Sequence, residues 1–451
     1  MKLTNLSTAL ILATVPATGV FAAALDRSGQ SVSAFLQPGN YFEAGISVLD
    51  PTVKGKETPA TGGRDIDNMG DDYYSPFAAL KLQLTDNFSF GLLYDHPFGA
   101  DAAYSGANEF VAAPSDSVLT GLPITTSQLG GVTGNTKVKV GTQNVSMIFG
   151  FQPNEVFNFY AGGVYQTVKG DVSLRGKTYS LYNGYDANIK ETSGVGWLVG
   201  AAFQIPEIAL KTSVTYRSEI DHNASTTETI AIADALSSMP ASQLQGLLSS
   251  LGNTGTAITP ALIKALAANA ESGKTKITTP QSVNLDFQTG IMNNTIAFAN
   301  LRWVDWSSFS IRPYKFGNVS TAVGPLLGLS NPSNARPNGF NIVQYSKDQF
   351  SATVGVGRKL NEQWAGNISL GWDSGAGNPV STLGPTEGYW NIGLGVQFNP
   401  TPSTFIAGGV KYFWLGDAKA QSASQAGSNN YVAEFKDNNA TAYGLKIGYR
   451  F

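Results

Sequence analysis

The clearest alternation of apolar and polar positions in the chain lies at its C-terminus. Between residues 438 and 451, one set of alternate positions is apolar or aromatic, and the other is mostly small or basic. The apolar set is Tyr443, Leu445, Ile447, Tyr449 and Phe451. A period of two residues indicates a β-strand, and an apolar face opposite a polar one is typical of a strand between lipid and a polar lumen. The inner face of a soluble β-sandwich is the alternative.

The same period recurs upstream, and it predicts an all-β fold, a 14-stranded antiparallel transmembrane β-barrel. Short connectors alternate with long ones (101–137, 220–282, 311–346 and 417–437), as expected for periplasmic turns and extracellular loops. The strands are predicted near residues 41–54, 73–84, 87–99, 138–151, 156–172, 194–204, 207–219, 283–291, 294–310, 347–358, 363–373, 386–398, 402–416 and 438–451.

The N-terminus has the pattern of an export signal. Lys2 precedes a short apolar run at 10–15, and small residues end at Ala24, so residues 1–24 are predicted to be a signal peptide. No later segment offers the roughly 18 uninterrupted apolar residues of a transmembrane helix. A closed barrel is the other structure in which all backbone hydrogen bonds are satisfied in lipid. An exported barrel of this kind predicts a location in the outer membrane of a Gram-negative cell.

Composition narrows the candidate chemistry. The chain has no cysteine and only two histidines, His96 and His222, so we expect no disulfide, no metal site and no cofactor. Its formal net charge of −3 gives no reason to expect a nucleic-acid partner. Only 14% of its residues are charged, and 50 of 451 are glycine, which suits a membrane barrel better than a cytosolic protein.

The seven tryptophans lie mainly at the ends of predicted strands. Amphipathic rings settle at the headgroup level of a bilayer, so an interfacial girdle is expected. Stacking on a ligand is the alternative. The residues are Trp197, Trp303, Trp306, Trp364, Trp372, Trp390 and Trp414.

Five segments carry distinctive motifs, in order along the chain: 42–51, 67–68 with 74–76, 93–99, 214–219, and the W-S-x-F motif at 303–309. Together they resemble the motifs of the FadL family of outer-membrane channels for long-chain fatty acids and related hydrophobic compounds. In this resemblance, segment 42–51 matches the family's first strand, which ends in aspartate-proline, and segment 93–99 lies where the family's third strand is kinked.

The resemblance also implies a hatch that plugs the barrel ahead of the first strand. Here only residues 25–40, which we call the hatch segment, separate the predicted cleavage site from that strand, against roughly forty residues in the family. Residues 36–40 (Leu-Gln-Pro-Gly-Asn) stand near the place of the family's Asn-Pro-Ala element. The barrel itself is expected to span 41–451.

Loop 220–282 carries two apolar stripes at helical spacing. A helix is predicted from Pro240 to Gly252, and a second from an N-cap at Thr259 with Pro260 at its first position to Gly273. The helices could form an apolar capture groove, as the family's loop helices do, or pack on each other as a lid. The apolar residues are Leu244, Leu247, Leu248, Leu251, Leu262, Ile263 and Leu266.

Pro97, Phe98 and Gly99 are candidates for a lateral opening. Proline cannot donate to a strand ladder and glycine weakens pairing, so the third strand should break there. The resemblance favours a door through which a ligand leaves sideways; the alternative is that Pro97 only ends the strand. His96 is expected to form a hydrogen bond at the rim.

A fatty acid also needs a cation for its carboxylate. Alternation places Arg217 in the lumen, and it is the carboxylate-binding candidate, although an arginine ending a strand can equally brace the wall.

The predicted function is passive uptake of long-chain fatty acids, by capture at the loop groove and lateral release. Uptake of aromatic or aliphatic hydrocarbons and a general porin for polar solutes are the alternatives. Neither histidine stands beside a recognisable nucleophile motif, so no enzyme is expected. Expected partners are the hydrophobic ligand, outer-membrane lipid and lipopolysaccharide, and the assembly machinery through Phe451; the protein is expected to be a monomer.

Overall fold

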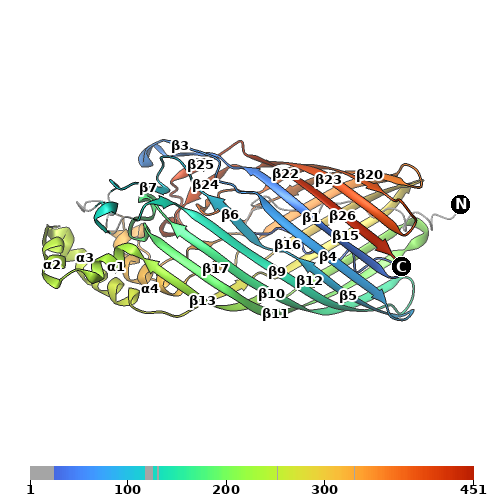
Figure 1. Ribbon diagram of the computed structural model, residues 1–451, viewed down its shortest axis with the longest axis horizontal. Coiled ribbons are helices and arrows are strands. Elements are labelled where there is room, and N and C mark those ends of the chain that lie inside the picture. The colour runs from blue at the N-terminus through green and yellow to red at the C-terminus, as the bar shows by residue number, and fades with distance from the viewer. Residues whose placement is uncertain (1–24, 117–124, 130–131, 251, 330) are drawn as a thin grey trace.

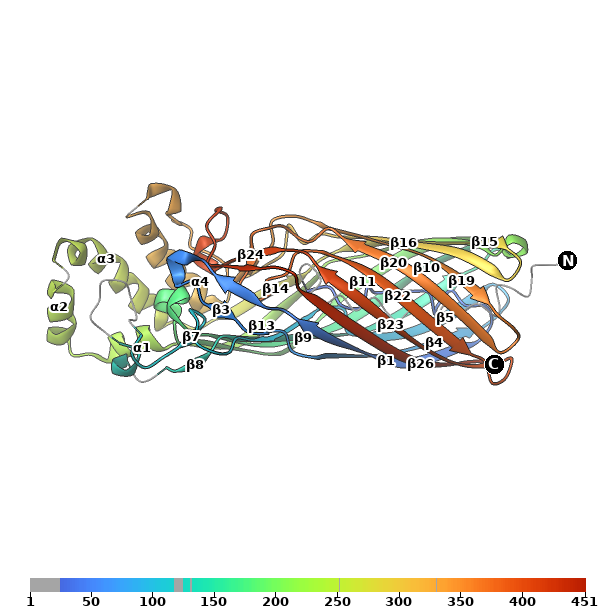
Figure 2. The same ribbon diagram turned by 90° about the horizontal axis from the view of Figure 1, so that it is seen from above.

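The described residues of the computed structural model form a closed barrel of 14 antiparallel strands (Figures 1 and 2). The structure describes residues 25–451 apart from 117–124, 130–131, 251 and 330, so the predicted signal peptide lies outside the described residues. The barrel strands are β1 (Tyr41–Thr52), β4 (Tyr73–Gln83), β5 (Phe88–Asp95) continued by β6 (Gly99–Ala103), β9 (Lys137–Phe151), β10 (Phe157–Leu174), β11 (Tyr185–Ile205), β12 (Leu210–Arg217) continued by β13 (Ile220–Ile230), β14 (Lys274–Thr279) continued by β15 (Ser282–Met292), β16 (Thr295–Val304), β19 (Gln349–Lys359), β20 (Trp364–Asp373), β22 (Tyr389–Phe398), β23 (Thr404–Leu415) and β26 (Asn439–Arg450).

The first and last strands close the barrel. β1 pairs with β4 on one side and with β26 on the other, from Tyr41 opposite Arg450 to Thr52 opposite Asn439. Closure leaves no strand edge facing lipid, which is the condition for a sheet to span a bilayer. The predicted strand number and antiparallel order are confirmed.

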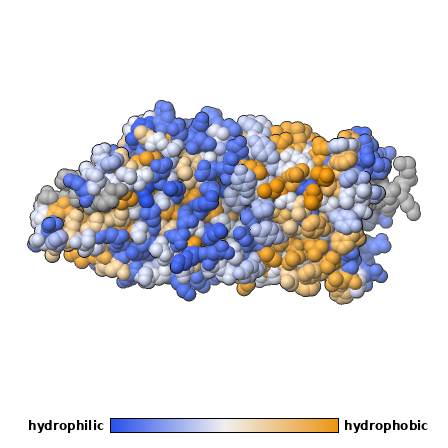
Figure 3. Space-filling model, in the orientation of Figure 1, coloured by the Kyte–Doolittle hydropathy of each residue, from blue (hydrophilic) through white to orange (hydrophobic). Residues whose placement is uncertain are grey.

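Side chains that alternate along the strands separate lipid from lumen. On β26, Leu445 is 56% exposed on the outer surface, whereas Ala442 is fully buried inside. A hydrophobic zone covers the half of the molecule that carries the short turns and the C-terminus, and the other half is mostly hydrophilic (Figure 3). The apolar zone marks the membrane-spanning part.

Five tryptophans lie on the outer surface as predicted: Trp197, Trp364, Trp372, Trp390 and Trp414 are exposed. Trp303 is partly buried, and its indole donates to Asp348 at 2.9 Å. The girdle prediction is wrong for Trp306, which is completely buried inside the barrel because β16 ends at Val304 and the chain turns inward.

Several strands extend beyond the membrane on the extracellular side. β11 has 21 residues, whereas a tilted strand crosses the hydrocarbon in about 9–11. Its outward positions beyond Val195 are polar or charged, for example Glu191 and Asn188. These strands form a wall around the extracellular loops, at the end where the helices lie (Figure 1).

The loop 220–282 is shorter than predicted because β13 and β14 continue the barrel wall up to residue 230 and from residue 274. Between them lie α1 (Ala231–Ser238), α2 (Ala241–Ser250) and α3 (Gly252–Asn269); α4 (Tyr314–Val323) belongs to a later loop. The prediction that Thr259 caps a helix is wrong: α3 begins at Gly252 and contains Pro260. None of the helices in the described part of the chain combines the length and hydropathy that a membrane crossing needs.

Small sheets and short turns complete the loops. A five-stranded sheet joins β2 (Gly55–Glu57), β3 (Asp65–Ile66), β21 (Val380–Ser381), β24 (Ala418–Gln421) and β25 (Ala433–Phe435). Two-stranded sheets pair β7 (Val111–Ala112) with β8 (Gly134–Asn135) and β17 (Ser310–Ile311) with β18 (Val343–Gln344). The 3-10 turns are Pro59–Thr61, Thr126–Leu129, Lys177–Tyr182, Pro206–Ile208, Gly324–Gly328, Pro332–Asn334 and Ala423–Gln425.

The lipid-facing assignment predicts the effect of a buried charge. Leu445→Arg, in the apolar zone of β26, should lower the free energy of unfolding by about 2–4 kcal/mol, because the guanidinium must enter hydrocarbon. Thr229→Arg, on an exposed outer position of β13 above that zone, is the matched control and should change it little. Guanidinium titrations of the protein in lipid vesicles measure both. Equal stability of the two variants would contradict the assignment of the hydrophobic zone.

Candidate functional site

The third barrel strand is interrupted at residues 96–98. Asp95 lies opposite Asn144 of β9, and Gly99 opposite Gly141, so the third strand carries one residue more than its neighbour between these pairs. Phe98 keeps contact with β9, since its amide donates to the Thr142 hydroxyl at 2.8 Å. The extra residue bends the strand as a β-bulge does.

The other edge of this kink has lost its barrel neighbour. β4 pairs with β5 up to Tyr94 and, among the described residues, has no ladder with β6. The pairing resumes higher up, where the amide of Ala103 donates to the carbonyl of Met69 at 2.9 Å. A section of strand edge around Pro97 and Gly99 is therefore open toward the lumen.

The start of the hatch segment occupies this edge. The amide of Arg27 donates to the carbonyl of Pro97 at 2.6 Å, and the amide of Gly99 donates to the carbonyl of Leu25 at 2.9 Å. Asp26 and Phe98 thus face each other as an antiparallel bridge. Pro97, Phe98 and Gly99 are all buried, so the kink is closed from inside by backbone hydrogen bonds.

Side chains hold this bridge in place. Asp26 accepts from Nε of Arg302 at 2.6 Å, and both side chains are buried. Arg302 also donates to Asn284 at 2.8 Å and to Gln30 at 3.0 Å. Breaking a buried ion pair leaves an uncompensated charge, so this cluster fixes the position of residues 25–30.

Arg27 fastens the segment to the kink from the other side. Its Nε donates to the carbonyl of Gly99 at 2.7 Å, and its guanidinium lies 3.7 Å from the centre of the Tyr73 ring. Burial lowers the pKa of Arg27 from its usual value, because a charged guanidinium loses its water. The ring and carbonyl contacts replace part of that hydration.

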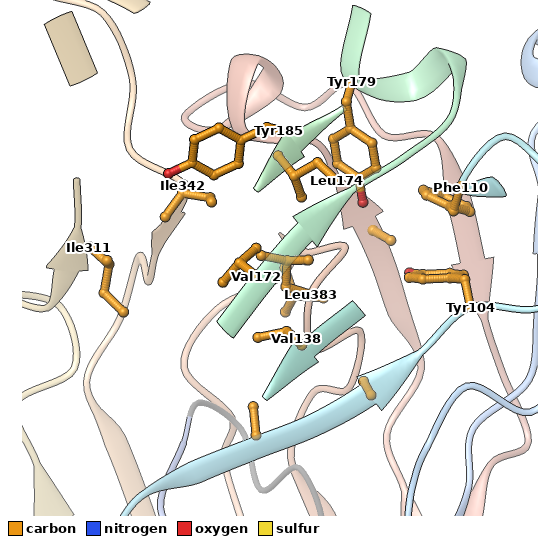
Figure 4. Packing of buried hydrophobic residues seen from close by; sticks show 14 of the residues in the cluster. Tyr104, Phe110, Val138, Val172, Leu174, Tyr179, Tyr185, Ile311, Ile342 and Leu383 are labelled. Atoms are coloured by element: carbon orange, nitrogen blue, oxygen red, sulfur yellow. The ribbon is translucent and has the colours of Figure 1, made fainter. Parts of the chain in front are cut away.

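Above the bridge lies an apolar region that reaches the extracellular loops. The Phe98 ring packs edge-on against Trp306, with 5.5 Å between ring centres. Leu25 lines two narrow cavities, one of about 20 Å³ beside the Phe98–Trp306 pair and one of about 30 Å³ bounded mainly by aliphatic side chains. Figure 4 shows Val138, Val172 and Leu383 of the second group together within this cluster. Nonpolar groups therefore extend from the loops to the kink.

The predicted groove residues cover the top of this region. Leu262 is buried, and Leu244, Leu247, Leu248 and Leu266 are partly buried against the same cluster. Ile263 is 59% exposed, and Leu251 lies outside the described residues. The arrangement matches the lid alternative, and the capture groove stays a prediction.

Arg217 lies in the lumen, as alternation predicts. It is buried on the wall of a cavity of about 290 Å³ below the bridge, which is lined by both charged and apolar side chains, and its Nη1 donates to the Ser146 hydroxyl at 3.1 Å. Asp95 lines the same cavity and accepts from Ser28. The cavity lies toward the periplasmic end of the barrel, away from the apolar region, so a role of Arg217 in carboxylate binding stays a prediction.

The two histidines form side-chain hydrogen bonds. Nε2 of His96 lies 2.7 Å from the Tyr94 hydroxyl, and Nε2 of His222 lies 2.9 Å from Oε1 of Gln166. Neither of these partners is a carboxylate that would orient the ring as a base.

Sequence reasoning missed Asp26, Arg27 and Arg302, although one signal for Arg302 was available. It shares the inward phase of Phe298 and Asn300 on β16, which would have placed a charge inside the barrel. No local pattern announced that residues 25–27 would pair with Pro97 and Gly99, because that contact joins segments about 70 residues apart.

Similar folds are known. A Pseudomonas aeruginosa FadL homologue aligns at 14% identity over 96% of this chain and 98% of its own, with a TM-score of 0.63. The P. putida toluene transporter TodX aligns at 10% identity over 93% and 91%, with a TM-score of 0.56. The Ralstonia pickettii toluene transporter TbuX aligns at 12% identity over 96% and 97%, with a TM-score of 0.53. At these identities the likeness concerns the fold.

No curated protein matches the sequence of this chain. The sequence model of the family described as outer membrane protein transport protein (OMPP1/FadL/TodX) matches residues 31–451. That range covers almost the whole chain, including all 14 barrel strands. The chain therefore belongs to the OMPP1/FadL/TodX family of outer-membrane transport proteins.

Proposed function

We propose that this protein takes up long-chain fatty acids passively and releases them sideways into the bilayer through the kink at Pro97–Gly99. The observation that carries the proposal is the pairing of residues 25–27 with this kink. A barrel wall that one lumen segment completes can open when that segment moves, with the rest of the ladder intact. On this proposal, the protein is a channel and has no catalytic activity.

The apolar region favours entry of a hydrophobic ligand from the extracellular side. Each buried methylene is worth about 0.8 kcal/mol, so a chain of some fifteen methylenes gains roughly 10 kcal/mol or more in an apolar environment. The cluster around Leu25, Phe98 and Trp306 provides that environment down to the level of the kink. Its present cavities are too narrow for a ligand, so uptake requires Leu25 to move.

The charged side chains in the lumen below the bridge favour the proposal that the ligand leaves sideways. Its cavity is lined by charged groups such as Lys211, Arg217 and Asp286. An alkyl chain passing there would lose its apolar contacts and would displace water from these charges. The outer membrane beside the kink offers the more favourable destination.

Uptake of aromatic or aliphatic hydrocarbons by the same route is the second candidate. The toluene transporters TodX and TbuX share the fold, and nothing in the apolar region requires a carboxylate. The protein is further proposed to be a monomer in contact with lipid and lipopolysaccharide, assembled through a signal that includes Phe451.

Straightening the kink should block release. In Pro97→Ala with Gly99→Val, the new amide and the branched side chain favour a continuous strand. A Cβ at Gly99 would lie 2.9 Å from the carbonyl of Val140 on β9 and 3.1 Å from the Tyr73 hydroxyl, so the backbone of the kink must also shift to admit the side chain. Uptake of radiolabelled oleate by cells should fall to the level of cells lacking the protein.

The matched control for that variant is Gly163→Val, on the outer face of β10 where an added Cβ meets nothing within 4 Å. It should transport normally. Heat-modifiable mobility on gels tests barrel assembly in each variant. Normal oleate uptake by an assembled double mutant would refute the lateral opening.

A reversible cross-link tests whether the hatch segment must leave the kink. Asp26 and Phe98 form a pair of the kind whose Cα atoms lie about 4.5 Å apart, within the range for a disulfide. The chain contains no cysteine, so Asp26→Cys with Phe98→Cys introduces a single bond. Oxidised cells should not take up oleate, and reductant should restore uptake to the level of the two single variants. Equal uptake before and after reduction would mean that the segment does not gate the exit.

The substrate class can be tested at Arg217. If the substrate is a fatty acid whose alkyl chain stays in the apolar region while its carboxylate reaches Arg217 below the bridge, Arg217→Met should lower oleate uptake and leave uptake of radiolabelled toluene unchanged. A variant that loses both has a damaged barrel wall. Wild-type preference for toluene over oleate would instead support the hydrocarbon candidate.

A further inference from the structure

The cavity between the hatch segment and the barrel wall contains an unbalanced charge. Four cationic side chains and three carboxylates line it, so one positive charge is left over when all seven are ionised. The cations are Lys211, Arg217, Lys411 and Lys446, and the carboxylates are Glu43, Asp95 and Asp286.

Three of the four cations have partners in the protein. Lys446 donates to Glu43 at 3.2 Å, Lys211 donates to the carbonyl of Leu36, and Arg217 donates to Ser146. Each of these contacts fixes a cationic group against the wall or the hatch segment.

Two of the carboxylates are also hydrogen-bonded elsewhere. Asp286 accepts from Asn300 at 2.8 Å, and Asp95 accepts from Ser28. They are not held by Lys411, and Glu43 is already engaged by Lys446 and by the Tyr41 hydroxyl at 2.6 Å.

Among the carboxylates of the cavity, Glu43 pairs with Lys446, Asp95 lies near Arg217, and Asp286 lies near Lys211. Lys411 is therefore the cation of this set that has no carboxylate neighbour. Its residue is only 6% exposed, and no acceptor or carboxylate among the described residues contacts its ammonium. It lies on β23 opposite Gly393 on one side and Ala442 on the other. A Cβ at Gly393 would come within 3.1 Å of Cγ of Lys411, so the glycine makes room for the lysine stem.

A buried ammonium without an anion is costly, since its removal from water is not offset by a Coulombic partner. Water in the cavity reduces this cost, and an anion would reduce it further. The cavity wall also carries the apolar side chains of Leu36, Leu93 and Phe298. Its volume lies at the small end of ligand pockets.

We propose that this cavity is a binding site for a small monocarboxylate with an apolar body, and that Lys411 holds the carboxylate. One surplus positive charge matches one carboxylate, whereas a phosphate dianion would leave a buried negative charge. The apolar side chains receive the rest of the ligand. The proposal does not depend on lateral release, because it concerns binding in the cavity, which is measured directly.

The cavity lies toward the periplasmic side of the barrel. Its lining includes Gln288 near the end of β15 and Gln37 of the hatch segment. The short hatch segment leaves this space between itself and the wall formed by strands such as β19 and β23, which contribute Thr353 and Lys411.

Benzoate is the probe that tests the site. Calorimetric titration of the protein in lipid nanodiscs should give saturable binding of one benzoate per chain, whereas benzyl alcohol, which keeps the ring and lacks the charge, should not saturate. Lys411→Met should weaken benzoate binding at least ten-fold, which is about 1.4 kcal/mol. Lys190→Met, on the exposed outer face of β11, is the matched control and should bind like wild type.

A second variant covers the case in which Lys411→Met does not assemble. Thr353→Phe keeps the lysine and fills the cavity, and it should also abolish saturable binding. Equal affinity of wild type with Lys411→Met, or with Thr353→Phe, would overturn the proposal, as would the absence of saturable benzoate binding to the wild type. Loss of oleate uptake plays no part in this test, so it separates the site from the transport proposal.

Discussion

The wall of a membrane barrel depends on complete pairing of its backbone N–H and C=O groups, because hydrocarbon offers no other partners. This pairing is interrupted in the third strand, where Pro97 has no amide hydrogen and the ladder between β4 and β5 ends at Tyr94. Residues 25–27 supply the missing partners from inside the lumen. The same segment is therefore both part of the plug and part of the wall, and its displacement would expose unpaired groups unless a ligand or water replaced it.

The two sides of this junction differ in polarity, and the proposed sideways exit of the ligand rests on this difference. Above it, Phe98 and Trp306 belong to an apolar cluster that continues to the loop helices. Below it, the ion pair of Asp26 with Arg302 begins a polar lumen. A hydrophobic molecule that reaches Phe98 is surrounded by nonpolar side chains on one side and charged groups on the other. Its remaining apolar neighbour is the membrane beyond the kink.

Regular alternation made most of the barrel predictable from the sequence. Leu445 and Arg217 point outward and inward as their positions require, because one face of each strand meets lipid and a shift of register would place charges in it. The kink was predictable as well, since Pro97 cannot donate to a ladder. In these cases local chemistry determines the structure.

Prediction failed where distant segments decide the structure. Trp306 resembles its girdle neighbours in sequence, yet it turns inward to pack on Phe98, more than 200 residues away. Pro260 signals a helix start, but α3 extends through it, and the helix packs on a core that no local pattern reveals. The pairing of residues 25–27 with the kink and the isolation of Lys411 depend in the same way on which segments fill the lumen.

The short hatch segment leaves part of the lower lumen unfilled, and charged and polar side chains line that space. Phe35 packs on Tyr160 at one side of the barrel, with 5.6 Å between ring centres, and fills that side with nonpolar groups. The space left near Lys411 and Thr353 is lined by charged and polar side chains, together with some apolar ones. An apolar wall there would have left a dry void without packing contacts, whereas polar side chains let water occupy the volume that the segment does not reach. A short plug is thus compatible with a stable barrel because charged and polar side chains in the unfilled part of the lumen allow water to enter it.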